Sequence, residues 1–204
     1  MNEGNSRSLW QRYAGVYDFF MQKDKRAYDV LGEKICAQIK DEMNVLELAC
    51  GTGLVTRRVA KRCKKYTATD FANKMLEKAK RIKGTEHVRF EQADATALVY
   101  SDNSFDAVII ANALHIMPDP VKALQNIKRV LKPGGILIAP TFMRPEGGKA
   151  SVAAKLLEFF GVHAYAQWTL ESYLAFLESS GWQIERSELI PSSLGIALVI
   201  GKAA

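Results

Sequence analysis

Apolar and polar positions along the middle of the chain follow two alternating periods. Short apolar runs predict buried strands near residues 44–49, 65–70, 87–92, 105–111 and 135–141. Between these runs, apolar residues recur at helical spacing, as they do at Val55, Val59, Ala60 and Cys63. Strands that alternate with helices in this way predict a parallel sheet with helices on both faces.

Helical periodicity continues on both sides of this region. Residues 5–38 are predicted to form a helical cover over the mouth of a ligand site. A glycine-rich break at 144–148 precedes an amphipathic pattern over 149–163, so we expect a lid-like insertion at 145–168. Asp119 and Pro120 have the residue types of a helix start, and Thr169 is predicted to cap a further helix that ends at Gly181.

Two apolar stretches at 182–189 and 194–200 close the sequence and are joined by a turn at 191–193, which predicts an antiparallel pair. The expected fold is therefore α/β: a doubly wound, mostly parallel seven-stranded sheet with helices on both faces and an antiparallel last strand, Rossmann-like. We expect a single domain over residues 1–204, because 204 residues suffice for one good core.

Composition narrows the class of protein only moderately. The chain is 48% hydrophobic and 25% charged, with no apolar run of membrane-spanning length and no leader pattern, so a cytoplasmic location is expected. Its net charge of +6 invites a nucleic-acid partner, but no basic stripe is interleaved with aromatic residues, which argues against one. The three cysteines have no metal-ligand spacing and are expected to be free thiols.

Candidate chemistry begins at the first strand, which breaks into Gly51-Thr52-Gly53 before a helix. Such a turn lets backbone N–H groups approach a ligand without an intervening Cβ. Asp70 ends the next apolar stretch, and a carboxylate at this spacing can accept both hydroxyls of a ribose. The pattern therefore predicts a cofactor that contains adenosine.

A dinucleotide is the first alternative. Its fingerprint has a third glycine where the helix packs on the strand, and this chain has Thr56 there. Glu47, at the mouth of the turn, would repel a pyrophosphate but suits an ammonium group. No tyrosine is followed four residues later by lysine, so the proton-relay pair of a short-chain dehydrogenase is missing.

The motifs taken together resemble those of the class I S-adenosylmethionine-dependent methyltransferases. The resemblance rests on four segments and on Asp70; the segments are Glu47–Gly53, Gln92–Ala95, Ser104–His115 and Val130–Ile136. It is closest to the branch that methylates small molecules, quinones and phospholipids, whose chains often open with a segment like Arg12–Asp18. Cys50 departs from this pattern, because the family often has glycine there.

The resemblance implies S-adenosylmethionine as cofactor and S-adenosylhomocysteine as product. No cluster of carboxylates beside the loop after the fourth strand offers a divalent-metal site, so no metal is expected. In this view Asp70 binds the ribose, Asp94 meets the adenine amino group, and Glu47 meets the cofactor ammonium. The implied cofactor-binding residues are Tyr13, Glu47, Ala49, Gly51, Thr52, Gly53, Asp70, Phe71, Met75, Asp94, Ala95, Asn112 and Ala113.

The expected reaction is methyl transfer to a small, partly apolar acceptor. Alignment and exclusion of water carry much of such a reaction, so a base is needed only if the acceptor keeps its proton. His115 and His163 are the candidates for that base. Two alternatives remain open: methylation of a phospholipid headgroup by an enzyme at the membrane surface, and a non-catalytic cofactor-binding protein. The oligomeric state is not predicted.

Overall fold

The computed structural model describes residues 22–144 and 165–204. Its strands are β1 (Asn44–Leu48), β2 (Lys65–Asp70), β3 (Arg89–Gln92), β4 (Phe105–Ile110), β5 (Leu131–Ile138), β6 (Thr141–Phe142), β7 (Trp182–Ile190) and β8 (Ile196–Ala203). Its α-helices are α3 (Lys25–Cys36), α4 (Thr56–Val59), α5 (Asn73–Ala79), α6 (Pro120–Val130) and α8 (Leu170–Ser179). Single 3₁₀ turns occupy η1 (Gln22–Asp24), η2 (Ala60–Arg62) and η3 (Leu114–Ile116).

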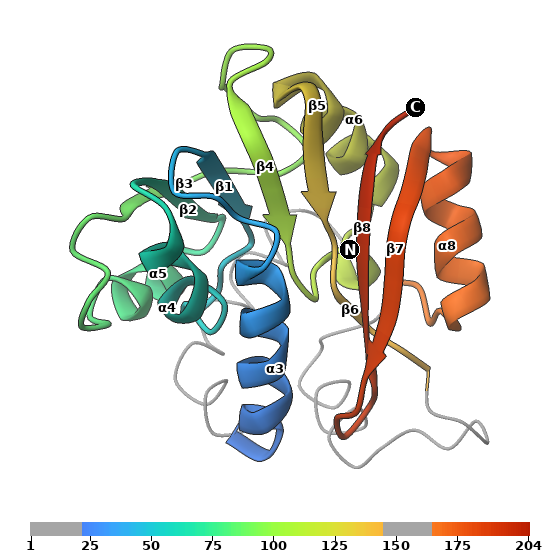
Figure 1. Cartoon of the computed structure of the whole chain (residues 1–204), viewed down its shortest axis with the longest axis horizontal. Coiled ribbons are helices and arrows are strands. Elements are labelled where there is room, and N and C mark those ends of the chain that lie inside the picture. The colour runs from blue at the N-terminus through green and yellow to red at the C-terminus, as the bar shows by residue number, and fades with distance from the viewer. Residues whose placement is uncertain (1–21, 145–164) are drawn as a thin grey trace.

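These strands form one sheet in the order β3-β2-β1-β4-β5-β8-β6, with β7 paired to β8 (Figure 1). Strands β1 to β5 pair in parallel, whereas β8 runs antiparallel to β5, β6 and β7. The predicted mostly parallel sheet and antiparallel last strand are confirmed. The expected closing hairpin is also present, since β7 and β8 pair along their lengths.

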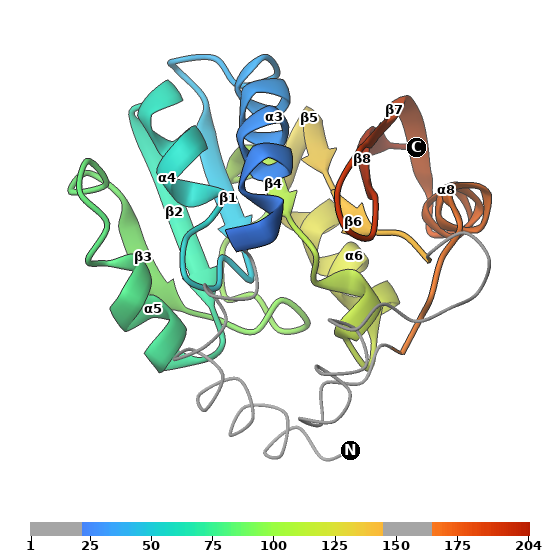
Figure 2. The ribbon, with the colours of Figure 1, turned by 90° about the horizontal axis from the view of Figure 1, so that it is seen from below.

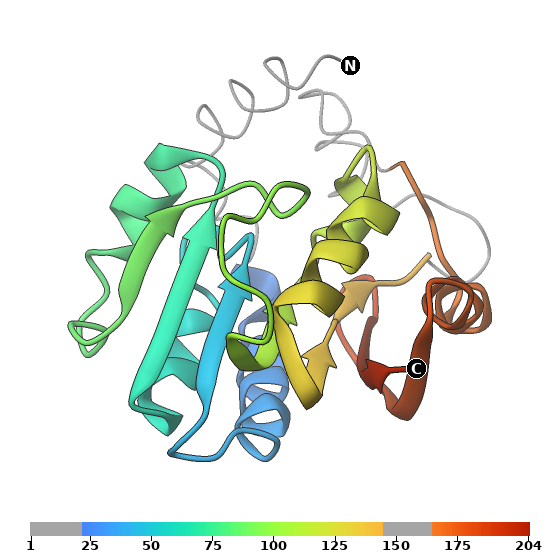
Figure 3. The same cartoon turned by 90° about the horizontal axis from the view of Figure 1, so that it is seen from above.

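Alternation along the strands explains why both faces are covered. In β1, Val45 packs with α3 and α4 on one face, while Leu46 and Leu48 pack with α6 and α8 on the other. Successive strand residues point to opposite faces, so an apolar run without polar alternation requires two covering layers. Figures 2 and 3 show helices on both sides of the sheet. The doubly wound prediction is thus confirmed.

One detail differs from the sequence prediction of seven strands. The run expected at 135–141 is two strands, β5 and β6, which are separated by Ala139 and Pro140. Both strands pair with β8: Ile138 lies opposite Ile200, Thr141 lies opposite Ala197, and the N–H of Ala139 donates to the carbonyl of Val199 between them. Pro140 has no N–H to donate and marks the break. The described part of the sheet therefore has eight strands.

The flanking predictions are tested only in part. The cover expected over 5–38 is described from residue 22, where η1 and α3 begin, and the helix expected over 149–163 lies outside the described residues. Asp119 caps α6 by accepting a hydrogen bond from the N–H of Lys122, as expected. Thr169 caps α8 through a reciprocal pair of hydrogen bonds with Ser172. No helix within 22–144 or 165–204 is long and apolar enough to cross a membrane.

The start of α3 is fastened to the hairpin between β7 and β8. The carboxylate of Asp24, which is buried, accepts hydrogen bonds from the backbone N–H of Ser193 at 2.7 Å and from its hydroxyl at 2.6 Å. These residues are 169 positions apart in the sequence. The tether fixes the direction in which α3 crosses the sheet.

We predict that Gly53→Ala destabilises the fold more than Gly134→Ala. Both glycines have positive φ, 82° and 76°. An added Cβ at Gly53 would lie 2.5 Å from Cδ1 of Ile82 and 3.3 Å from Cβ of Ala79, whereas no atom of the described residues lies within 4 Å of one at Gly134. The left-handed backbone should cost about 1 kcal/mol at either position. Displacement of the flexible end of Ile82 should add about 1 kcal/mol at Gly53, the lower end of the usual cost of overpacking. Equal losses of unfolding free energy in urea would contradict the packing argument.

Candidate functional site

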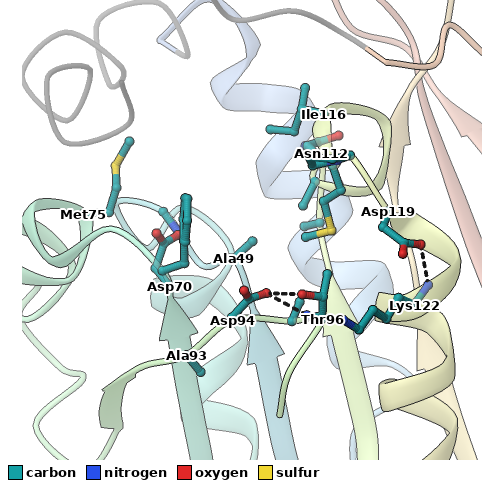
Figure 4. A pocket seen from close by; sticks show the side chains of 17 residues that line it. Ala49, Asp70, Met75, Ala93, Asp94, Thr96, Asn112, Ile116, Asp119 and Lys122 are labelled. Carbon is teal, nitrogen blue, oxygen red and sulfur yellow. Dashed lines mark hydrogen bonds between the residues drawn. The ribbon is translucent and has the colours of Figure 1, made fainter. Parts of the chain in front are cut away.

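A cavity of about 220 Å³ opens at the carboxyl ends of the parallel strands. Its lining residues follow β1, β2, β3 and β4, which are neighbours in the sheet although they are far apart in the sequence. Figure 4 shows Ala49, Asp70, Asp94 and Asn112 gathered around it. Ligands of open α/β sheets bind at this edge, so the location agrees with the one expected from sequence.

The glycine turn is joined to Asp70 by hydrogen bonds across β1 and β2. One carboxylate oxygen of Asp70 accepts the N–H of Gly51 at 2.8 Å, and the other accepts the N–H of Ala72 at 2.8 Å. The N–H of Cys50 donates to the carbonyl of Thr69, also at 2.8 Å. Burial raises the pKa of Asp70 to about 6, although the backbone donors at Ala72 and Gly51 oppose the rise.

Backbone strain lies at Ala49 and Asn112. Their φ angles are +53° and +52°, in the left-handed region that residues with a Cβ avoid, and both residues line the cavity. Cys50, the departure from the expected motif, is outside that region. Non-glycine residues held in this conformation cluster at ligand sites, where the surrounding structure imposes it. The positive φ angles of these two residues were not predicted from the sequence.

A second carboxylate lies on the cavity wall after β3. One oxygen of Asp94 accepts hydrogen bonds from both the N–H and the hydroxyl of Thr96, each at 2.8 Å. Apolar wall is supplied by Ala95, by Phe71 and by Met75, whose side chain is almost fully buried. This part of the cavity combines a fixed acceptor with apolar surface, which suits a flat heteroaromatic ring that carries an N–H donor.

The structure does not bring Glu47 to the cavity wall. Its side chain is buried, and Oε2 accepts hydrogen bonds from the hydroxyls of Thr56 at 2.6 Å and Tyr66 at 2.9 Å. Burial raises the pKa of Glu47 to about 7, while the two hydroxyl donors oppose the rise. The carboxylate joins β1, β2 and the start of α4 beneath the glycine turn.

Nine of the predicted cofactor-binding residues line the cavity: Ala49, Gly51, Asp70, Phe71, Met75, Asp94, Ala95, Asn112 and Ala113. Glu47, Thr52 and Gly53 are among the described residues but do not line it. Tyr13 and His163 lie outside the described residues. The roles assigned to individual residues stay predictions.

His115 lies beside the cavity rather than on its wall. Nδ1 of its ring is 3.1 Å from the hydroxyl of Thr141, and Phe142 meets the ring edge to face. Its carbonyl accepts the N–H groups of Tyr165 and Ala166, which ties the loop after β4 to the segment before α8. Burial lowers the pKa of His115 to about 4.

Eight lining residues were not predicted from the sequence, and most of them lie between β4 and the first turn of α6. They are Ala93, Thr96, Ala111, Ile116, Met117, Pro118, Asp119 and Lys122. The predicted helix start at Pro118-Asp119-Pro120 was the available signal, because a helix that follows β4 begins at the same sheet edge as the other ligand loops. Ile116, Met117 and Pro118 give this end of the cavity an apolar surface.

Comparison with known proteins finds a family that resembles this edge of the sheet. A model described as "Methyltransferase domain" matches residues 46–139, from β1 to the end of β5. The chain is similar to this family through that segment. Nine of the cavity residues predicted from the motifs fall within the matched segment.

Relatives of the methyltransferase domain include two enzymes of quinone biosynthesis. The chain is 41% identical over 102 residues to the demethylmenaquinone methyltransferase of Clavibacter sepedonicus, covering 50% of this chain and 42% of that one. It is 36% identical over 117 residues to the ubiquinone/menaquinone biosynthesis C-methyltransferase UbiE of Cronobacter sakazakii, covering 54% and 47%. The chain thus spans about half the length of these curated relatives.

The structural likeness extends beyond the matched segment. The magnesium protoporphyrin IX methyltransferase ChlM of Synechocystis, solved with bound S-adenosylhomocysteine, superposes over 100% of both chains with a TM-score of 0.74 at 15% identity. The two chains therefore share a common fold.

We predict that Glu47→Gln makes stability less dependent on pH. The raised pKa of Glu47 favours the native state while the carboxyl is protonated, and this contribution is lost as pH rises from about 4.5 to about 7. Glutamine keeps an acceptor oxygen for Thr56 and Tyr66 without that loss. The difference in the free energy of unfolding between the variant and wild type should therefore shift in favour of the variant by roughly 2–3 kcal/mol between pH 4.5 and pH 8.

Urea unfolding at several pH values measures this difference. Asp70 titrates in both proteins, so its own contribution is shared; only its electrostatic coupling to Glu47 differs between them. Glu77→Gln, at an exposed position of α5, serves as the control and should parallel wild type at every pH. If the free energies of unfolding of Glu47→Gln and wild type differed by the same amount at every pH, Glu47 would not titrate in this pH range.

Proposed function

We propose that this chain transfers the methyl group of S-adenosylmethionine to a small, partly apolar, quinone-like acceptor. The observation that supports this most strongly is the row of ligand positions along the carboxyl edge: Asp94 after β3, Asp70 at the end of β2, Ala49 and Gly51 after β1, and Asn112 after β4. The cofactor is a linear molecule of adenine, ribose and methionine, and a row of this kind can hold it extended.

Each part of the cofactor has a chemically matched partner in this arrangement. Asp70 offers carboxylate oxygens, already oriented by two backbone amides, to the ribose hydroxyls. Asp94 offers its carboxylate to the amino group of adenine, and Phe71 and Met75 pack against the ring. Gly51 leaves room for the backbone of the turn to lie close to the ribose and the sulfonium.

In this proposal the acceptor binds at the apolar end of the cavity, which is formed by Ile116, Met117 and Pro118. A nucleophilic atom of the acceptor attacks the sulfonium methyl carbon, the bond between sulfur and that carbon breaks, and its electron pair stays on sulfur. The products are the methylated acceptor and S-adenosylhomocysteine, and any proton on the acceptor atom is released. The names of the two quinone-biosynthesis relatives support a ring of this class.

The first test is cofactor binding by calorimetry. The wild-type protein should bind S-adenosylmethionine and S-adenosylhomocysteine, and it should not bind NAD. Asp70→Asn should weaken binding by about 1.5–3 kcal/mol through loss of charge-assisted hydrogen bonds. Asp102→Asn, at an exposed ion pair with Arg129, is the matched control and should bind as wild type does. Tighter binding of NAD than of S-adenosylmethionine would overturn the assignment.

The pKa of Asp70 gives the same experiment a pH signature. Because that pKa is raised to about 6, lowering the pH from 7 to 5 protonates the carboxylate in the free protein and removes its charge. Cofactor affinity should therefore fall over this range in wild type and stay nearly level in Asp70→Asn. If cofactor affinity changed with pH in the same way in both proteins, Asp70 would not be the residue that binds the ribose hydroxyls.

Methyl transfer itself is tested with methyl-labelled S-adenosylmethionine and two acceptors, a demethylated quinol and phosphatidylethanolamine vesicles. Label should enter the quinol. Label in the lipid would favour the phospholipid alternative, and cofactor binding without transfer to either acceptor would favour a non-catalytic binding protein. Transfer to the quinol in the presence of a chelator is also expected, since the proposal involves no metal.

Proton removal by His115 is tested separately. The ring of His115 contacts Thr141 and Phe142, and its pKa is lowered to about 4, so we expect His115→Ala to reduce turnover less than tenfold. Alignment and desolvation would then carry the reaction. A loss of about 10²–10⁴-fold with unchanged cofactor affinity would instead identify His115 as the base.

A further inference from the structure

The order of the strands decides where the amino-acid end of the cofactor lies. This step rests on the proposed function. With adenine beside Asp94 and ribose beside Asp70, the ligand runs from β3 to β2 and then toward β1 and β4. Its methionine end therefore reaches the residues that follow β4, which are Ala111, Asn112 and Ala113.

Asn112 has an unused hydrogen-bond acceptor at this place. The residue is 8% exposed and lines the cavity, and its Oδ1 atom is buried without a hydrogen-bond partner among residues 22–144 and 165–204. A buried acceptor without a partner costs roughly 1–3 kcal/mol, so it marks a position that a ligand donor can satisfy. Its neighbours Ala111 and Ala113 carry no side-chain acceptor.

The orientation of this amide is set by a residue of α3. Nδ2 of Asn112 donates a hydrogen bond to the hydroxyl of Tyr28 at 2.9 Å, which leaves Oδ1 as the other end of the amide. The backbone of Asn112 is fixed as well, since its N–H donates to the carbonyl of Pro140 at 2.8 Å. Side-chain rotation is the remaining way to turn the amide, and the hydrogen bond to Tyr28 favours the orientation in which Nδ2 faces α3 and Oδ1 faces away from it.

Tyr28 is itself held in place by the packing of α3 on α4. Gly32 of α3 has no Cβ, and one added there would lie 2.8 Å from Cβ of Arg58. The guanidinium of Arg58 lies 5.9 Å from the centre of the Tyr28 ring and also donates to the carbonyl of Leu54 at 2.6 Å and to Asp29. Tyr28 therefore has a fixed position relative to the glycine turn.

We propose that Tyr28 is a positioning residue for the amino-acid end of the cofactor: it fixes the Asn112 amide so that Oδ1 accepts a hydrogen bond from the cofactor ammonium. Tyr28 lies outside residues 46–139, the segment that matches the family model. Glu47, the residue that sequence reasoning assigned to the ammonium, has its Oε2 engaged by Thr56 and Tyr66 and does not line the cavity.

The test compares three ligands that differ at the amino-acid end. Decarboxylated S-adenosylmethionine also keeps the sulfonium methyl group, so the loss in each variant is measured for each ligand against wild type. S-adenosylhomocysteine carries both the ammonium and the carboxylate, decarboxylated S-adenosylmethionine keeps the ammonium alone, and 5′-methylthioadenosine has neither. Calorimetry is carried out with Tyr28→Phe, Asn112→Gly and Asn112→Asp. Glycine suits the left-handed backbone at position 112, so that variant relieves strain rather than adding it. Asn103→Gly is the matched control, because Asn103 is also left-handed, with φ +55°, but is exposed and lies outside the cavity wall.

Asn112→Gly should weaken binding of S-adenosylhomocysteine and of decarboxylated S-adenosylmethionine by roughly tenfold to a hundredfold. Binding of 5′-methylthioadenosine should stay within about threefold. Tyr28→Phe should show the same selectivity with a smaller loss, and it should add nothing to Asn112→Gly in the double variant. Asn112→Asp should restore ammonium-dependent binding, since a carboxylate supplies the same acceptor.

The following results would overturn the positioning role. Equal losses for all three ligands would show that Tyr28 and Asn112 support the fold rather than recognise the ammonium. A loss confined to S-adenosylhomocysteine would assign Asn112 to the carboxylate. Additive losses of binding free energy in the double variant would show that Tyr28 does not act through Asn112. A wild-type protein that binds none of the three ligands would instead refute the proposed function.

Discussion

The site depends on one carboxylate whose two oxygens each hold a different backbone amide. Asp70 ends β2, and through Gly51 and Ala72 it fixes the turn after β1 and the turn after β2 relative to each other. Backbone amides orient a carboxylate more rigidly than flexible side chains can, because their positions are set by the sheet. The row of ligand positions from Asp94 to Asn112 keeps its spacing for this reason.

A consequence of this arrangement is that the acids near the cavity have separate tasks. Asp70 and Asp94 face the cavity, whereas Glu47 is buried below the turn with Thr56 and Tyr66. Two carboxylates close together in a region of low dielectric disfavour each other's ionisation, and the charge of Asp70 contributes to the raised pKa of Glu47. Glu47 therefore stabilises the turn best when it is neutral, while Asp70 suits a ribose best when it is charged.

Most of the fold could be predicted because it depends on local periodicity. Adjacent apolar residues in β1 and β4, such as Val45 and Leu46 or Val108 and Ile109, point to opposite faces and require covering layers on both, and the motif loops must then meet at one edge. The interruption at Pro140 could have been anticipated from its missing N–H. The left-handed backbone of Ala49 could not, since nothing in the residue type of alanine indicates it. Nor could the contact between Tyr28 and Asn112, which lie 84 positions apart and meet only through the packing of α3 on α4.

The tether between Asp24 and Ser193 has a consequence for the order of folding. During synthesis the chain emerges from its N-terminal side, so α3 is made early but acquires this anchor only after the hairpin of β7 and β8 has followed. Contacts between such distant positions form late, because the entropy of closing a long loop must be offset first. The sheet edge with Asp70 and Asp94 can assemble while α3 is still unanchored, and β7 and β8, which follow later in the chain, then hold α3 and its Tyr28 in place.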